Sequence, residues 1–193
     1  MKVDRPVSQR ELRSVGPRER ILAAADKLFY AQGIRAVGVD AVAAQADVSK
    51  RTLYAYFRSK DDLIAAYLQG RFRYIAPSDA PAREQILGVF DRLEQAFARD
   101  GFRGCPYVNA VTELSDPRHP AAAIALQFKE ERRVWFRGLL ERLNVKDPEG
   151  LATQMQLLVE GALVSAVVRG DATPARAARA AAEVLLAAAA RKR

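Results

Sequence analysis

The sequence has few of the residues that most often carry metal or thiol chemistry. Its 193 residues include one cysteine, Cys105, and one histidine, His119. An intrachain disulfide needs two cysteines and a Cys/His zinc site needs several such ligands, so counting excludes both. We therefore expect no metal centre and no cofactor, and we assign no catalytic residue.

Long apolar runs are also missing. Half of the residues are hydrophobic, yet no uninterrupted apolar stretch approaches the roughly 20 residues needed to span a bilayer. The first ten residues contain no apolar segment of the kind found in signal peptides. We expect a soluble, cytoplasmic protein that does not bind membranes.

Strand patterns are absent as well, since no segment alternates polar and apolar residues for long. Helical periodicity, broken by Gly, Pro and capping residues, instead predicts an all-α fold of about nine helices. In the first part of the chain we expect four helices: one from Gly16-Pro17 to Gly33, one over Val39–Ala46, one of nine residues from Lys50, and one that begins after Ser59. In the remainder we expect five: one through Ile86–Phe97 to Gly101, one over Tyr107–Leu114, a long one that ends near Asn144, one over Leu151–Arg169, and one that begins at Thr173-Pro174.

The segment Ala76–Pro81 interrupts all periodicity and is the best candidate domain boundary. We expect an arm over residues 1–15, a small domain over 16–75 and a larger one over 76–193. In the arm, Arg10 and Arg13 could contact phosphates, although a disordered tail is the alternative.

Positive charge is concentrated near the N-terminus. The net charge is +8, and residues 1–74 hold a surplus of six basic residues against two in the remainder. A basic domain on a nearly neutral body fits a polyanionic partner. A charged face kept for solubility is the alternative.

The stretch Val48–Leu63 is the most informative part of the chain. Ser49 is a predicted N-cap, with Val48 and Leu53 placed as a hydrophobic staple. In the helix that begins at Lys50, Leu53 and Phe57 fall on the buried face. The outward face holds Arg51, Thr52 and Ala55, flanked by Tyr54 and Tyr56. Such groups suit base edges and phosphates in a major groove, whereas an ordinary surface turn is the alternative.

A second helix start follows directly. Ser59 is the predicted cap of the next helix, and Lys60 lies in its first turn, where free N–H groups already favour an anion. Ser59 and Lys60 together form a plausible phosphate clamp.

These motifs resemble the TetR family of bacterial transcriptional regulators. The resemblance is strongest over Ile21–Leu63, in Ala31-Gln-Gly33, Val39-Asp-Ala-Val-Ala43 and Val48–Leu63, and extends with less specificity to Phe102–Asn109 and Ser115–Pro120. It implies a helix-turn-helix head joined to a helical body. It also implies a homodimer formed through the last two helices, and most often a repressor that a small molecule releases from a palindromic operator.

The resemblance also assigns contacts to DNA. Lys50, Arg51, Thr52 and Ala55 would face bases, and Tyr54, Tyr56 and Lys60 would hold phosphates. Gly38 is on the phosphate side too, although the family usually has a hydroxyl residue there that both caps the helix and reaches a phosphate. Glycine can cap the helix but has no hydroxyl that could reach a phosphate. The family usually has Gly where this chain has Asp47, at a turn that often needs a left-handed backbone.

Two further sets of residues are predicted for the body. A pocket for a hydrophobic or aromatic effector would use the residues Phe97, Cys105, Tyr107, Asn109, Phe128, Trp135 and Met155. Core packing is the alternative, notably for Phe97, Phe128 and Met155, and Cys105 could be a small buried hydrophobe or a redox or electrophile sensor. The dimer interface would use Leu157, Val164, Val168, Ala181, Val184, Leu185 and Ala188.

Two functions of other classes stay open at this point. One is an enzyme that uses Cys105 as nucleophile and His119 as base, although His119 also fits a solvent-exposed cap at a helix start. The other is a helical scaffold or membrane-surface protein that uses the Ala-rich last helix and the basic Arg191-Lys-Arg tail.

Overall fold

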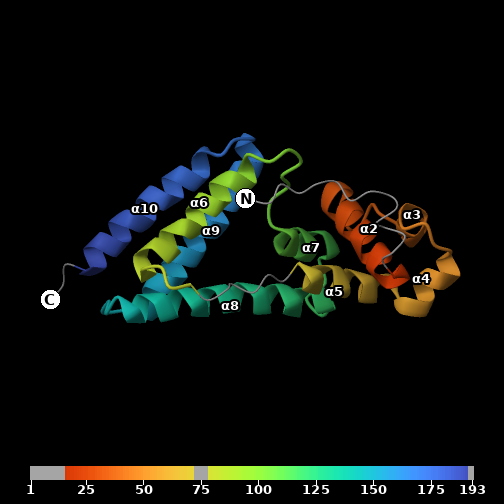
Figure 1. Cartoon of the computed structure of the whole chain (residues 1–193), viewed down its shortest axis with the longest axis horizontal. Coiled ribbons are helices and arrows are strands. Elements are labelled where there is room, and N and C mark those ends of the chain that lie inside the picture. The colour runs from red at the N-terminus through yellow and green to blue at the C-terminus, as the bar shows by residue number, and fades with distance from the viewer. Residues whose placement is uncertain (1–15, 72–77, 191–193) are drawn as a thin grey trace. The chain divides into compact units, whose positions relative to one another are not determined.

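The computed structural model describes residues 16–71 and 78–190, and all regular structure in these ranges is helical. It confirms the predicted all-α fold (Figure 1). The described helices are α2 (Pro17–Gln32), α3 (Val39–Gln45), α4 (Lys50–Tyr56), α5 (Lys60–Gly70), α6 (Ala82–Phe97), α7 (Pro106–Leu114), α8 (Pro120–Arg142), α9 (Pro148–Arg169) and α10 (Thr173–Ala190). The arm with Arg10 and Arg13, residues 76 and 77 of the boundary, and the basic tail lie outside the described residues.

The helix ends are set by local capping, as the sequence predicts. The hydroxyls of Ser49 and Ser59 each accept a hydrogen bond from the backbone N–H three residues later, and the Asp147 carboxylate does the same for α9. At the other end, Gly33 terminates α2 and Gly170 terminates α9 with positive φ angles of 94° and 71°. L-residues with a side chain rarely adopt such angles, so glycine is the natural stop.

Three helices end earlier than predicted, α3 by one residue, at Gln45 rather than Ala46. Helix α4 has seven residues rather than nine, because Phe57 takes an extended backbone (φ −132°, ψ 109°) and buries its ring. Helix α6 ends at Phe97 rather than Gly101, since the chain closes a turn in which the N–H of Phe102 bonds the carbonyl of Arg99. The predicted end of α4 is wrong because Phe57 fits the apolar face whether or not the helix continues, and that of α6 because the prediction placed the stop at Gly101 although the turn comes earlier.

The described chain divides into two compact units. One, here called the head, contains residues 16–71 together with 109–124; the other, here called the body, contains 78–108 and 125–190. In the head, α2 packs against α3, α4 and α5, and Phe29 meets Tyr67 edge to face across α2 and α5. The predicted division at residues 75 and 76 remains a prediction.

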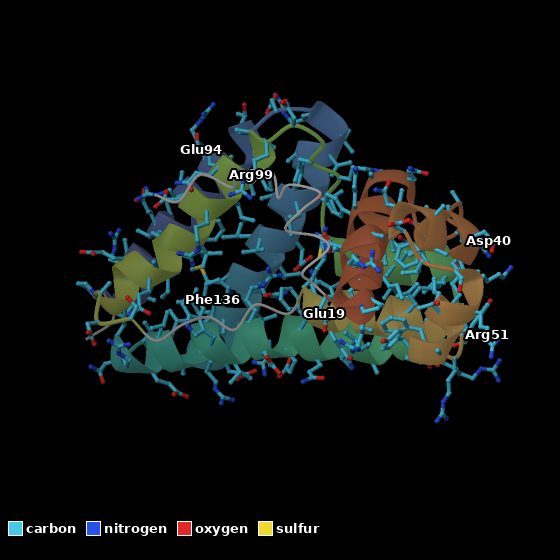
Figure 2. All side chains as sticks on the ribbon, turned by 45° about the vertical axis from the view of Figure 1, so that its right-hand side comes forward. Glu19, Asp40, Arg51, Glu94, Arg99 and Phe136 are labelled. Atoms are coloured by element: carbon cyan, nitrogen blue, oxygen red, sulfur yellow. The ribbon has the colours of Figure 1, made fainter. Side chains whose placement is uncertain are left out.

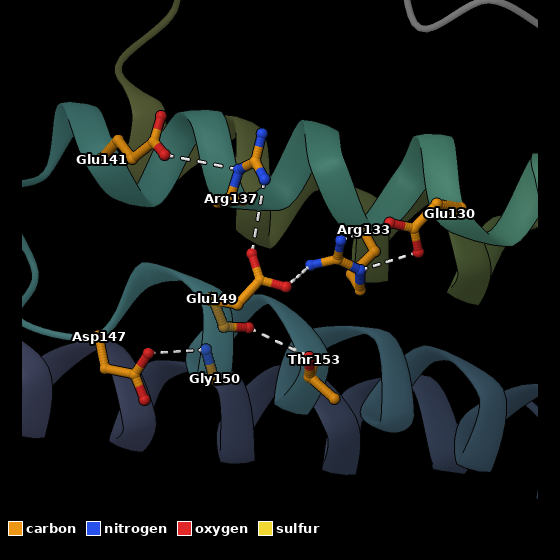
Figure 3. Close-up of polar contacts among 8 residues, drawn as sticks. All are labelled: Glu130, Arg133, Arg137, Glu141, Asp147, Glu149, Gly150 and Thr153. Carbon is orange, nitrogen blue, oxygen red and sulfur yellow. Dashed lines mark hydrogen bonds and ion pairs between the residues drawn. The ribbon is translucent and has the colours of Figure 1, made fainter.

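In the body, α10 lies along both α6 and α9 (Figure 1). Ion pairs join α10 to α6 through Arg176 with Glu94 and Arg179 with Asp91, both at 2.8 Å. Helix α8 turns Phe136 inward (Figure 2), where that ring is fully buried. Figure 3 shows Glu149 of α9 between two arginines of α8, so polar contacts help to fix these helices against each other.

One described helix, α9, is long and apolar enough to cross a membrane by length and composition alone, with a mean hydropathy of 1.5. Core helices of soluble proteins pass the same test, and α9 packs against α10 and α6 in the body. Packing in the body accounts for its buried residues, such as Met155 and Val159, and the helix gives no indication of a membrane protein.

Candidate nucleic-acid interface

Helix α4 is anchored at both ends within the head. The Ser49 hydroxyl accepts a hydrogen bond from the N–H of Thr52 at 3.0 Å and lies 2.8 Å from the Thr52 hydroxyl. Just before this cap, Asp47 has a φ of 54°, which confirms the left-handed turn predicted there. Leu53 and Phe57 are buried, so the helix presents one defined face to solvent.

The outward face of α4 carries the residues that the sequence predicts for DNA. Arg51 and Ala55 are exposed, Tyr54 and Tyr56 are 41% and 45% exposed, and Thr52 is half-buried, with its hydroxyl bonded to that of Ser49. Figure 2 shows Arg51 extending away from the head. A cation, a small residue and two phenols on one exposed face offer donors to phosphates and to base edges. The individual DNA contacts remain predictions.

Lys50 has a partner that the sequence analysis did not assign. Its ammonium lies 2.9 Å from one carboxylate oxygen of Asp40 and 3.1 Å from the other, so the pair joins the first turns of α4 and α3. The hydrogen bond from this ammonium to Asp40 raises the pKa of Lys50. Asp40 could have been recognised only as an acidic residue in a helix first turn.

Gly38 and Lys60 flank α4 on the chain, and both have defined surroundings. Gly38 is exposed and caps α3 with an ordinary extended backbone, and no atom lies within 4 Å of the position that a Cβ would occupy. Lys60 is half-buried at the start of α5, and this burial lowers its pKa against the opposing effects of Asp61 and Glu113. Their predicted phosphate contacts stay predictions.

Glu113 is a second residue that sequence reasoning missed. From the C-terminal half of α7 its carboxylate accepts a hydrogen bond from the backbone N–H of Arg35 at 3.1 Å. The same oxygen lies 2.9 Å from the position of a Cβ on Gly33. Glu113 thus supports the turn between α2 and α3, on which the placement of the helix-turn-helix depends. No local pattern could reveal a contact across 78 residues.

The predicted pocket residues lie mostly in the body. Tyr107 stacks on Phe128 with ring centroids 4.1 Å apart, Phe97 meets Phe102 at 4.8 Å, and Trp135 meets Phe136 at 5.1 Å. Met155, Tyr107, Phe97 and Cys105 are buried, Phe128 and Trp135 are partly exposed, and Asn109, also partly exposed, belongs to the head. An open groove on the body lies elsewhere, between α9 and α10. The pocket assignment therefore remains a prediction.

The residues predicted for a dimer interface form an exposed apolar stripe. Leu157, Val164, Val168 and Val184 are 64%, 57%, 81% and 68% exposed, although such side chains usually avoid water. Ala188 is exposed as well, and Ala181 and Leu185 are partly exposed. The groove beside this stripe is lined by small residues that include Gly161, Ala177 and Ala181.

Cys105 and His119 have separate structural roles. The Cys105 sulfur, in the body, accepts a hydrogen bond from the ammonium of Lys129 at 3.3 Å. In the head, Nδ1 of His119 accepts from the N–H of Ala121 at 3.0 Å, which confirms the predicted cap at the start of α8. The expectation that this cap is solvent-exposed is wrong: the imidazole is 9% exposed, because it packs toward Asp61 of α5, whose carboxylate lies 3.3 Å from Nε2.

Comparison with known proteins identifies the family. Residues 21–67 match the family described as bacterial regulatory proteins, tetR family. A crystal structure of a TetR transcriptional regulator from Streptomyces avermitilis, sav143, is 37% identical with a TM-score of 0.81, over 91% of this chain and 98% of that one. YjdC of Escherichia coli, an HTH-type transcriptional regulator, is 28% identical over 154 residues, which are 76% of this chain and 81% of YjdC.

A shorter match is to SCO4008 of Streptomyces coelicolor, an HTH-type transcriptional repressor, which is 35% identical over 74 residues, or 38% of each chain. All three relatives are regulators of transcription, which sets aside the enzyme that uses Cys105 and His119. Because a relative at 37% identity is matched over nearly its whole length, the chain belongs to the TetR family and is a DNA-binding transcriptional regulator.

Proposed function

We propose that the protein is a homodimeric repressor that binds a palindromic operator through α4. The observation that carries this proposal is the exposed face of α4, with Arg51, Tyr54 and Tyr56 turned to solvent on a capped helix. In the proposed complex, Lys50, Arg51, Thr52 and Ala55 face bases, while Tyr54, Tyr56, Lys60 and the backbone at Gly38 face phosphates.

The exposed stripe on α9 and α10 supports a second copy of the chain as the partner of the body. Leu157, Val164 and Val168 repeat at helical spacing on α9, and Val184 adds a fourth large apolar side chain from α10. Small residues beside them, such as Gly161 and Ala177, would let helices approach closely. A two-fold dimer buries the same patch on both copies, so one apolar stripe is sufficient.

Dimer geometry then defines the operator. Two recognition helices enter successive major grooves on one side of B-DNA when they are about 34 to 36 Å apart. An effector that binds the body better at another separation would shift the dimer away from DNA, and by linkage DNA would weaken effector binding equally. Repression itself is supported by the relative SCO4008, which is named a repressor.

The proposed effector is a small hydrophobic or aromatic molecule. Its support is the set of aromatic side chains in the body: Tyr107 stacks on Phe128, and Phe128 and Trp135 are partly exposed, as suits the lining of such a site. We propose that the other predicted pocket residues line the same effector site. We also propose a cytoplasmic location, as fits a protein that acts on DNA.

Replacement of Tyr54 tests the DNA interface. The wild type, Tyr54→Phe and Tyr54→Ala are titrated onto a site recovered by selection from random DNA, over a series of salt concentrations. A lost phosphate contact weakens binding by about 1 kcal/mol per head, or roughly fivefold. The proposal expects Tyr54→Ala to bind at least this much more weakly, with Tyr54→Phe in between because it keeps the ring. Binding that is insensitive to both substitutions, or to salt, would overturn it.

A further inference from the structure

We propose that Asp40 is a specificity-determining residue of the DNA interface, which acts by holding Lys50 away from phosphates and aiming it at a base. The proposal rests on the proposed function, in which α4 enters the major groove. Asp40 lies on α3 rather than on the recognition helix α4. Its pairing with Lys50 distinguishes that cation from its neighbour Arg51.

The geometry of the pair limits what Lys50 can bind. Its ammonium has three N–H donors and donates one hydrogen bond to Asp40, at 3.1 Å, while the other Asp40 oxygen lies 2.9 Å from it. Its other donors remain for further acceptors, such as the O6 and N7 atoms of guanine. A lysine has a flexible four-carbon side chain, so without a partner it would reach whichever phosphate lies nearest.

Arg51 provides the internal comparison. It follows Lys50 directly on α4 and is exposed, and among the residues that the structure describes no carboxylate lies within 4.0 Å of its guanidinium. Two adjacent cations on one recognition helix therefore differ in their freedom. Phosphate contacts are independent of sequence and base contacts are not, so a carboxylate that restrains Lys50 lowers its share of non-specific binding, while Arg51 reaches its base without such a restraint.

The pair has little to contribute to folding. The side chains of Lys50 and Asp40 are 55% and 73% exposed, and exposed ion pairs contribute little to stability because water and salt screen them. Asp40 also brings a negative charge to a surface that must approach phosphates, which by itself opposes binding. Asp40 also lies in the first turn of α3, where the free N–H groups favour a carboxylate, so its effect on DNA binding has to be separated from its effect on stability by a test that depends on Lys50.

The test measures salt dependence on two DNA duplexes, the selected site and a random-sequence duplex. In Asp40→Asn, each released Lys50 gains a phosphate contact, so the slope of log K against log salt on random DNA steepens by about 0.9 per head. Non-specific binding tightens, and the ratio of specific to non-specific affinity falls. Asp100→Asn, which makes the same charge change on an exposed residue of the body, leaves both quantities unchanged.

A double-mutant comparison shows whether the effect passes through Lys50. In a Lys50→Gln background, Asp40→Asn removes only the repulsion between the Asp40 carboxylate and the phosphates. The slope of log K against log salt on random DNA therefore does not steepen. An unchanged slope and ratio in Asp40→Asn, or equal steepening with and without Lys50, would overturn the inference. If instead the wild type shows no salt-dependent DNA binding at all, the proposed function fails first, so the two failures can be told apart.

Discussion

A serine in place of Gly38 is expected to stabilise the head and to tighten operator binding. Gly38 is the N-cap of α3, with φ −82° and ψ 159°, and it makes no side-chain cap. Any residue can adopt this backbone, and nothing lies within 4 Å of where a Cβ would stand. Position 38 can thus accept a side chain without strain or collision.

The expected magnitude has two parts. A serine N-cap is better than glycine by a few tenths of a kcal/mol, and the smaller freedom of the unfolded chain adds about 0.4 to 1 kcal/mol. The free energy of unfolding should therefore rise by about 1 kcal/mol. The hydroxyl can accept the cap bond and also donate to a phosphate, which contributes about 1 kcal/mol per head. Across a dimer this makes binding about thirtyfold tighter.

Gly38→Ala is the matched control, since it fills the same space without a hydroxyl. It should be less stable than the serine variant by about 1 kcal/mol, because alanine cannot cap. Urea unfolding gives the stability, and anisotropy titration of the selected site at one salt concentration gives the affinity. Equal DNA affinity of the serine and alanine variants would refute the claim that position 38 faces a phosphate.

Three other substitutions test the fold and the dimer. Gly33→Ala should lower the free energy of unfolding by about 1 to 3 kcal/mol, because φ is 94° and the new Cβ would lie 2.9 Å from a Glu113 oxygen. Urea unfolding measures this loss, and the double variant Gly33→Ala with Glu113→Ala should keep the part of the loss that comes from the strained φ angle. Ser49→Ala should cost about 1 kcal/mol through loss of the α4 cap, and recovery with Ser49→Asn in the same assay would attribute the loss to capping. Leu157→Asp should weaken dimerisation at least tenfold in sedimentation equilibrium, by about 1.4 kcal/mol or more. Leu126→Asp, on a similarly exposed leucine of α8, should leave dimerisation unchanged. A dimer that is insensitive to Leu157→Asp would exclude the stripe on α9 and α10 as the dimer interface.

The features that sequence predicts well are those decided within a few residues. The caps of α4, α5 and α9 each depend on a side chain and an N–H three residues apart, so Ser49, Ser59 and Asp147 could be assigned directly. The buried face of α4 follows from helical spacing, which places Leu53 and Phe57 together. Such local rules were sufficient for these caps and for the outward face of α4.

The features that sequence misses depend on contacts between elements. Asp40 meets Lys50 only because the turn between α3 and α4 brings two helix starts together, and Glu113 reaches Arg35 across 78 residues. The stacking of Tyr107 on Phe128 likewise needs the packed body. Helical spacing cannot distinguish a ring that lines a pocket from one that fills the core, so the pocket residues could not be separated from core residues.

The central claim, that two copies of α4 read matched half-sites, is tested most directly by selecting bound sequences from random DNA with the full chain. The account predicts a palindrome whose half-sites are centred about one helical turn apart, roughly 34 to 36 Å, and its loss with Arg51→Ala. Recovery of no shared sequence, or of a single unpaired half-site that survives Arg51→Ala, would contradict it.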